Sequence, residues 1–270
     1  MQWVLQDFED TQKLAEALDR LGLAYSWHKV VPFVGDLLPE PEVADPNAVV
    51  MFGSYSLWRY AEAKGYQPGV FEITPFVEEA VWHPYLLNGA DSLFMTLRDI
   101  PEQFVDDDRL WFVRPVGDSK EEAGQVKSSA EVIETAKRVM SLDEEDIPNG
   151  SLRHDTELMF SAPVRILKEW RLWAVGGKIV TYSLYKEGRR VVYREEIDED
   201  ALAFAQDMVD LNPDYSPAYV IDVCRTEEGL RLLETNCLNG AGFYAADLMK
   251  LALAIEGLEL RPLQRSKVSG

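Results

Sequence analysis

Residues 219–236 read YVIDVCRTEEGLRLLETN, and the pattern within this stretch decides how the C-terminal part of the chain folds. Apolar residues dominate its two ends, and the glutamates and glycine in its middle favour a turn. This pattern predicts an antiparallel hairpin centred near Glu228. The apolar residues beside its acids favour a half-buried hairpin.

Two acidic residues of this hairpin are predicted to face each other. A turn centred at Glu228 places Asp222 directly opposite Glu234, and Asn236 shares a face with Glu234 because strand side chains alternate. Like charges in such a pair repel, so the pair must share a proton or hold a cation. Two carboxylates and an amide oxygen suit a hard cation such as Mg²⁺. The alternative is an exposed hairpin whose acids simply belong to an acidic surface.

Three basic residues are candidates to hold an anion beside such a cation. Arg114 ends the strand-like run LWFVRP, Lys120 lies in the loop GDSK, and Arg171 lies within KEWRLW. An arginine inside an apolar strand needs a partner for its guanidinium. Glu169, two residues away on the same face, offers an internal ion pair as the alternative interpretation of Arg171. Together with an Mg²⁺ site, the three cations suggest a triphosphate site.

The composition is that of a folded, acidic protein. The chain has 270 residues, 47% of them apolar, which is enough for two domains or one large one. The 27 Lys and Arg against 47 Asp and Glu give a net charge of −20. This charge disfavours broad nucleic-acid binding and allows only a local basic cleft. Two cysteines, Cys224 and Cys237, favour the reducing cytoplasm. We find neither a membrane-spanning apolar run nor a secretory signal at the acidic N-terminus.

The periodicity predicts an α/β chain with an α+β core. The first third alternates strands and helices, which indicates a small parallel unit. The middle is predicted to contain one strand, a loop at 115–124 and a helix, and the last 120 residues two hairpins, each followed by a helix. The expected strands are 3–5, 23–31, 48–52, 109–114, 164–175, 178–185, 191–194, 219–224 and 230–235. The expected helices end at Gly22 or cover 55–64, 129–142, 198–211 and 245–255.

Other nucleotide and catalytic motifs are weak in this sequence. The chain has no GxxxxGK[ST] phosphate loop, and Gly240-Ala241-Gly242 imitates a dinucleotide fingerprint without the returning strand that this motif requires. The three histidines share no local spacing with a nucleophile, and no zinc-binding spacing occurs. The candidate chemistry therefore rests on the carboxylates and the basic residues.

Three segments, in this order, resemble the ATP-grasp superfamily. They are FVRPVGDSK at 112–120, KEWRLWAVGGKIVTYSLY at 168–185 and YVIDVCRTEEGLRLLETNCLNGAGFY at 219–244. The resemblance is to an uncharacterised bacterial and phage clade marked by two arginines and a lysine. It implies an ATP-grasp fold with an N-terminal βαβ pre-ATP-grasp domain. The implied boundaries are 1–85 for that domain, 86–257 for an ATP-grasp domain of two lobes, and 258–270 for a polar tail.

The resemblance also implies roles for individual residues. Arg114 takes the place of the family's usual phosphate-binding lysine, and Lys120 matches the lysine of the loop that folds over the triphosphate. Arg171 resembles the arginine that faces phosphate or an acyl-phosphate. The implied ligands of one or two Mg²⁺ ions are Asp222, Glu234 and Asn236. The segment 159–163 would form the hinge beside adenine, and the other residues expected at the nucleotide are Met159, Ser161 and Glu169.

The implied activity is an ATP- and Mg²⁺-dependent ligation of a carboxylate to an amine through an acyl-phosphate, with Arg171 and Lys120 as catalytic groups. The substrates would be small molecules or peptides. Two alternatives stay open. One is RNA-end repair at the same ATP site, for which the best basic cleft consists of Arg189, Arg190 and Arg194. The other is a nucleotide-binding module without turnover.

Two further expectations concern the loops and the hairpin. Substrate pockets are expected at the loops 53–55, 88–89 and 240–243, although each could equally be a simple turn. If Asp222 and Glu234 only repel each other, Glu234→Gln should slightly stabilise the metal-free protein. The same change should weaken binding of ATP with Mg²⁺.

Overall fold

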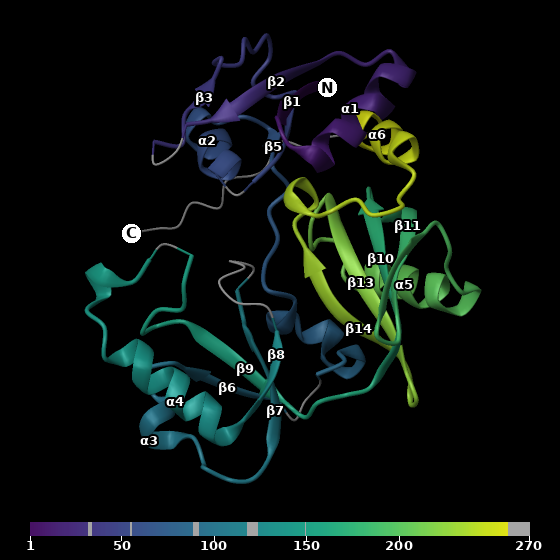
Figure 1. Ribbon diagram of the computed structural model, residues 1–270. Helices are drawn as coiled ribbons and strands as arrows, with labels where there is room; N and C mark the ends of the chain where they lie inside the picture. The colour runs from purple at the N-terminus through teal and green to yellow at the C-terminus, as the bar shows by residue number, and fades with distance from the viewer. Residues whose placement is uncertain (32–33, 55, 89–91, 118–123, 149, 259–270) are drawn as a thin grey trace.

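The computed structural model describes residues 1–31, 34–54, 56–88, 92–117, 124–148 and 150–258, and its strands form three sheets. The N-terminal sheet lies at the top of Figure 1, the middle sheet at the lower left and the C-terminal sheet at the right. This mixed α/β architecture confirms the predicted fold class. Within the described ranges, no helix is long and apolar enough to cross a membrane.

The N-terminal sheet has the strand order β3-β2-β1-β4-β5. β1 pairs in parallel with β2 and β4, β4 pairs in parallel with β5, and β3 is antiparallel to β2. The bounds of its strands are β1 Gln2–Gln6, β2 Tyr25–Val30, β3 Leu37–Leu38, β4 Val49–Phe52 and β5 Pro68–Gly69, and those of its helices are α1 Glu9–Leu21 and α2 Ser56–Lys64. The alternation predicted for the first third is therefore confirmed.

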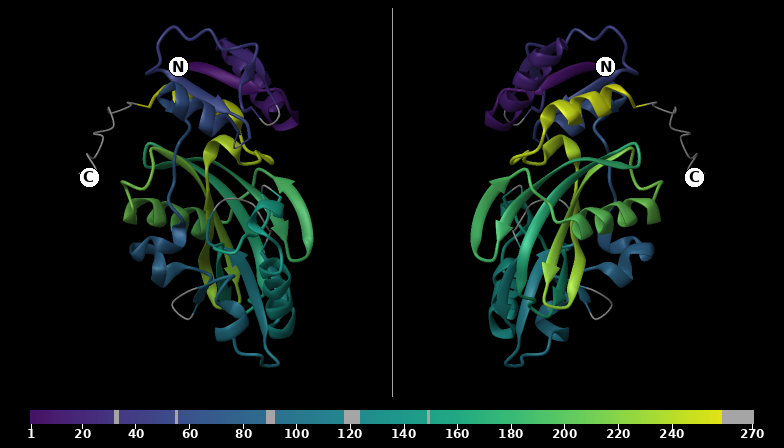
Figure 2. Two further views of the ribbon diagram at one scale, coloured as in Figure 1. Left: turned by 90° about the vertical axis from the view of Figure 1, so that its left-hand side faces the viewer. Right: turned by 90° about the vertical axis from the view of Figure 1, so that its right-hand side faces the viewer.

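The last helix returns to the N-terminal unit. α6, Leu248–Glu256, packs against α1, and Figure 2 shows the two helices side by side in both views. Its predicted start at residue 245 was three residues too early. Asp247 caps the helix, because its carboxylate accepts hydrogen bonds from the backbone N–H groups of Met249 and Lys250. The first and last parts of the chain thus share one hydrophobic core.

The middle sheet is antiparallel throughout, with the strand order β6-β9-β7-β8. Only β7 and the long helix were predicted, because the other strands are short. The bounds are β6 Leu93–Thr96, β7 Leu110–Pro115, β8 Gln125–Ser128, β9 Glu157–Ser161, α3 Ile100–Gln103 and α4 Ser129–Met140. Four 3₁₀ turns complete the described helices, at Phe76–Glu78, Ala80–Tyr85, Glu144–Asp146 and Leu238–Gly240. Both α-helices cover the same face of the sheet, which carries the core of this unit.

The C-terminal sheet is also antiparallel, with the strand order β12-β11-β10-β13-β14. Its bounds are β10 Ile166–Val175, β11 Lys178–Glu187, β12 Arg190–Arg194, β13 Ala218–Thr226, β14 Gly229–Asn236 and α5 Glu199–Leu211. The predicted turn at Gly176-Gly177 is confirmed. Both glycines have positive φ, 58° and 76°, as a two-residue hairpin turn requires.

The predicted pairing of Asp222 with Glu234 is confirmed as well. Next to the turn, Thr226 pairs with Gly229, so the turn is centred half a residue before Glu228. A register shift after Asp222 compensates for this difference. The acidic pair therefore meets because of an irregularity in the strand, which the sequence pattern did not reveal.

The two faces of the C-terminal sheet have different partners. One face carries Trp170, Leu172 and Ile221, which belong to a core shared with α5. On the other face, Trp173 and Val220 belong to the core shared with the N-terminal unit. The rest of this second face is not covered by that unit, and it carries the candidate site.

Asn239 connects the N-terminal unit to the segment that follows β14. It is 3% exposed, its amide donates to the carbonyl oxygen of Met51 at 2.7 Å, and its oxygen accepts from the N–H of Phe71 at 2.8 Å. Asn239→Ala should therefore lower the free energy of unfolding by about 2–4 kcal/mol, because two buried backbone groups lose their partner. Urea unfolding measures this change. In the exposed control Asn47→Ala we expect less than about 0.5 kcal/mol, and an equal effect in both variants would contradict the prediction.

Candidate functional site

The site lies where the middle and C-terminal sheets face each other. Arg114 pairs with Met159 and Phe112 pairs with Ser161, so these four side chains share one face of the middle sheet. The opposite face, with Val113 among its residues, belongs to the core under the helices. Met159 is buried against residues of the C-terminal unit. The face with Arg114 is therefore the one directed at the C-terminal sheet.

Arg171 and Asp222 form the buried centre of the site. They are cross-strand partners on β10 and β13, and the guanidinium donates two parallel hydrogen bonds to the carboxylate, Nε to Oδ1 at 2.9 Å and Nη2 to Oδ2 at 2.8 Å. The Asp222 side chain is fully buried, and that of Arg171 is 9% exposed. Such a bidentate pair holds the guanidinium in one orientation.

Glu234 lies beside this pair and joins the two lobes. Its Oε2 accepts a hydrogen bond from Arg114 of the middle sheet at 2.9 Å, and its Oε1 accepts from the amide of Asn236 at 3.2 Å. Arg171 lies 3.9 Å from the same carboxylate. Two arginines from different lobes therefore converge on two carboxylates of one hairpin.

The charges of these groups shift their acidities. Burial raises the pKa of the Asp222 carboxyl to about 6, although Arg171 opposes the rise. Burial also raises the pKa of the Glu234 carboxyl, but Arg114 and Arg171 together outweigh it and hold that pKa below its usual value. Glu234 is thus stabilised as an anion. The expected sign for Glu234→Gln in the metal-free protein is reversed, because attraction to two arginines exceeds the repulsion from Asp222.

The alternative interpretation of Arg171, an ion pair with Glu169, is wrong. Glu169 accepts a hydrogen bond from the hydroxyl of Tyr185 at 2.8 Å and pairs with Lys186 at 2.7 Å. Arg171 instead turns to the neighbouring strand, where Asp222 lies directly opposite. Cross-strand neighbours lie closer than residues two apart on one strand.

The other expected nucleotide residues lie at the end of β9. Met159 and Ser161 belong to this strand, so the predicted hinge at 159–163 is only partly a connection, and the segment between β9 and β10 is 162–165. The Ser161 hydroxyl is buried and lacks a hydrogen-bond partner among the described residues, although it shares a face with Arg114. Such an orphaned polar atom is where a polar ligand would be satisfied. Lys120 lies outside the described residues.

Sequence reasoning missed the apolar part of this face. Phe94 pairs with Met159, and Val126 pairs with Phe112, which places both on the face that carries Arg114. Their exposed fractions are 46% and 53%, high for apolar residues next to a charged site. The alternation in QVKS and LFMT would have shown this face, had these short segments been predicted as strands.

The expected substrate loops fall partly outside the described residues, which exclude 55 and 89–91. The described parts of two of them meet, since the N–H of Gly53 donates to the carbonyl oxygen of Asn239 at 3.0 Å. A side chain at Gly53 would collide with the side chains of Leu57 and Gln6, so this position has room for glycine alone. The loop after β4 therefore lies tightly against the segment that leads out of the acidic hairpin.

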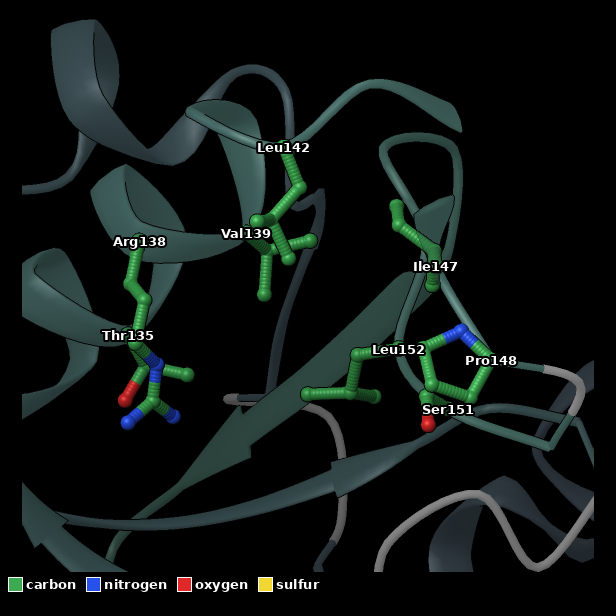
Figure 3. Close-up of a pocket in the computed structure, with 8 residues that line it drawn as sticks. All are labelled: Thr135, Arg138, Val139, Leu142, Ile147, Pro148, Ser151 and Leu152. Carbon is green, nitrogen blue, oxygen red and sulfur yellow. The ribbon is translucent and has the colours of Figure 1, made fainter. Parts of the chain in front are cut away.

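A separate hollow of about 260 Å³ lies under the end of α4 (Figure 3). It is lined mainly by apolar residues and by the side chains of Thr135, Arg138 and Ser151. Arg138 is its one charged residue, so it lacks the paired charges of the site described above.

The donor set partly fits the Mg²⁺ that the ATP-grasp resemblance implies. Glu234 and the side-chain oxygen of Asn236 are hard ligands, and Mg²⁺ in proteins often uses one or two carboxylates together with waters and substrate phosphates. Asp222 is occupied by Arg171 on both oxygens. In the described part of the chain, no group of three His, Cys, Asp or Glu residues could hold a metal ion. Asp222 therefore stays a predicted ligand, and it could bind a cation only after Arg171 moves.

Two antiparallel lobes that meet at interleaved arginines and carboxylates define an ATP-grasp fold. Residues 60–255 match the model of an ATP-grasp domain family, the third family of the clade that is named after two arginines and a lysine. The chain belongs to this family, and the predicted resemblance is thereby confirmed.

Solved structures agree on the fold. The D-alanine–D-alanine ligase from Bacillus anthracis complexed with ATP matches with a TM-score of 0.59 and 10% identity, over 94% of this chain and 95% of that one. The D-cycloserine synthetase DcsG matches at 0.55 and 17%, over 94% and 98%. The L-amino acid ligase from Bacillus licheniformis matches at 0.58 and 14%, over 96% and 76%. No curated protein matches the sequence.

Proposed function

We propose that this protein is an ATP- and Mg²⁺-dependent carboxylate–amine ligase that acts through an acyl-phosphate. The observation that carries the proposal is the convergence of Arg114 and Arg171, from opposite lobes, on the carboxylates Asp222 and Glu234. Cations for the phosphates and anions for a metal thus lie within one hydrogen-bonded cluster. The three ligases that share the fold support the same class of reaction.

The proposed reaction has two steps. A carboxylate oxygen of the first substrate attacks the γ-phosphorus of ATP, ADP leaves, and an acyl-phosphate forms. The amine of the second substrate then attacks the acyl carbon, phosphate leaves, and the amine loses a proton. Arg114 and Arg171 stabilise the charge of the transferring phosphoryl group, and Lys120 is proposed to do the same. Mg²⁺, held by Glu234, Asn236 and the phosphates, would add further charge neutralisation.

The substrates are proposed to enter beside the N-terminal unit. Ligands of open α/β sheets bind outside the carboxyl ends of the strands, where neighbouring strands lead to helices on opposite sides. In the N-terminal sheet this place is next to Gln6 and Gly53, at the ends of β1 and β4. The contact of Gly53 with Asn239 places it against the segment that continues from the acidic hairpin.

The RNA-repair alternative has less support from the described residues. Arg194, one of its three candidate arginines, lies 3.3 Å from Glu187 and 3.2 Å from Glu196. Its charge is therefore offset locally, and no specific observation favours a basic cleft on β12.

An isotope experiment tests the proposal. The protein is incubated with ATP, Mg²⁺ and a panel of amino acids and dipeptides whose carboxylates carry ¹⁸O. We expect ADP and phosphate with one ¹⁸O atom, because the acyl-phosphate returns one carboxylate oxygen to phosphate. Label in AMP, or an ATP site without any turnover across the panel, would contradict the proposal. Arg114→Met should reduce turnover at least about 100-fold, whereas the exposed control Arg109→Met should leave it unchanged.

A further inference from the structure

Three tyrosines form a continuous stack beside the phosphate-binding residues. Tyr185 and Tyr244 have ring centroids 5.2 Å apart and planes inclined by 30°. Tyr244 and Tyr193 are 4.9 Å apart and inclined by 13°. The three rings come from β11, from the segment between β14 and α6, and from β12. Their near-parallel order indicates one column built from three distant parts of the chain.

The inner end of this column contacts Arg171. The guanidinium carbon lies 4.8 Å from the centre of the Tyr244 ring and 5.8 Å from that of Tyr185. The hydroxyl of Tyr185 is bound to Glu169. The stack therefore begins at the arginine that faces the proposed phosphoryl group.

Two backbone irregularities lie in the same column. Tyr244 has φ 50°, and it is the one non-glycine residue with positive φ in the described part of the chain. Tyr185 is the extra residue of a bulge, because Glu169 pairs with Lys186 and Trp170 pairs with Leu184. Both features are typical of positions where a side chain is directed into a functional site.

The outer end of the column is open. Tyr193 is 57% exposed, and β12, which carries it, is the terminal strand in the order of its sheet. Tyr244 covers one side of this ring. An exposed ring that is already stacked on one side offers its other side to a planar group.

We propose that the outer face of Tyr193 binds an aromatic ring carried by one of the two substrates. The proposal rests on the ligase function above and names its substrate class, a carboxylate or an amine with an aromatic side chain. A further ring extends the parallel stack. A cationic group would instead approach a column that already holds Arg171 at its inner end, and this favours the neutral ring.

Binding of matched probes tests this inference. The probes are phenylalaninamide and N-acetylphenylalanine, each compared with its cyclohexylalanine counterpart, which has a similar shape without a π system. Calorimetry with ADP and Mg²⁺ present should show at least one aromatic probe binding about 5–10 times more tightly than its counterpart. Tyr193→Leu should remove this difference, Tyr193→Phe should keep it, and the distant control Tyr85→Leu should leave it unchanged.

The outcomes separate this inference from the proposed function. Equal affinities of aromatic and cyclohexyl probes for the wild type would overturn the inference, as would tighter binding of a cationic probe such as choline. A ring preference that survives in Tyr193→Leu would also overturn it. Label transfer to phosphate without any ring preference would leave the ligase function standing alone. A ring preference that depends on Tyr193, without label transfer, would support the aromatic site and remove the ligase function.

Discussion

Replacing Arg171 with methionine should lower the free energy of unfolding by about 3–5 kcal/mol. The change leaves the carboxylate of Asp222 fully buried without its bidentate partner. Glu234 then lies next to it with one arginine fewer to separate the two charges. Urea unfolding at neutral pH measures the loss, provided that both chains unfold in one transition.

Two controls identify the cause of this loss. Arg165→Met removes an arginine from an ion pair with Glu227 at 3.1 Å, but these side chains are 78% and 67% exposed, so the change should stay within about 1 kcal/mol. The double variant Arg171→Met with Asp222→Leu should regain much of the stability, because no unpaired charge remains. Additive losses in the double variant would show that packing, and not the buried charge, causes the effect.

The C-terminal sheet shows how far the sequence predicts this site. The pairing of Asp222 with Glu234 followed from the turn and from the alternation of side chains, and the structure confirms it. The partner of Arg171 did not follow. Its nearest acid on the same strand was Glu169, whereas the structure places it against Asp222, a residue 51 positions further along the chain. Which strands are neighbours depends on the whole sheet, and local periodicity carries no information about it.

The middle sheet was predicted least well, for a related reason. β6, β8 and β9 have only four or five residues each, and their faces are shared between a core and an exposed site. A strand of this length contains too few alternations to be distinguished from a loop. Phe94 and Val126 were therefore missed, although the residues of the longer β7, including Arg114, were found. The prediction failed where an apolar side chain faces a site and not a core.

The glutamine variant of Glu234 should lose most of the effect of Mg²⁺ on ATP binding. In the wild type, Mg²⁺ should tighten ATP binding because Glu234 and Asn236 offer oxygen ligands beside two phosphate-binding arginines. We expect Glu234→Gln to weaken ATP binding at least about tenfold with Mg²⁺ present, and much less in EDTA. Calorimetric titration with ATP, in each condition, measures both values.

The metal-free protein and a second glutamate of the same hairpin complete this experiment. Because Arg114 and Arg171 stabilise the Glu234 anion, Glu234→Gln should lower the stability of the metal-free protein by about 1 kcal/mol, and thermal unfolding detects such a change. Glu228→Gln makes the same charge change at the turn, where the side chain is 87% exposed, and should alter neither quantity. If Mg²⁺ strengthens ATP binding equally in both variants, the cation does not bind at this hairpin. A more stable metal-free Glu234→Gln protein would instead mean that repulsion from Asp222 exceeds the attraction of the two arginines.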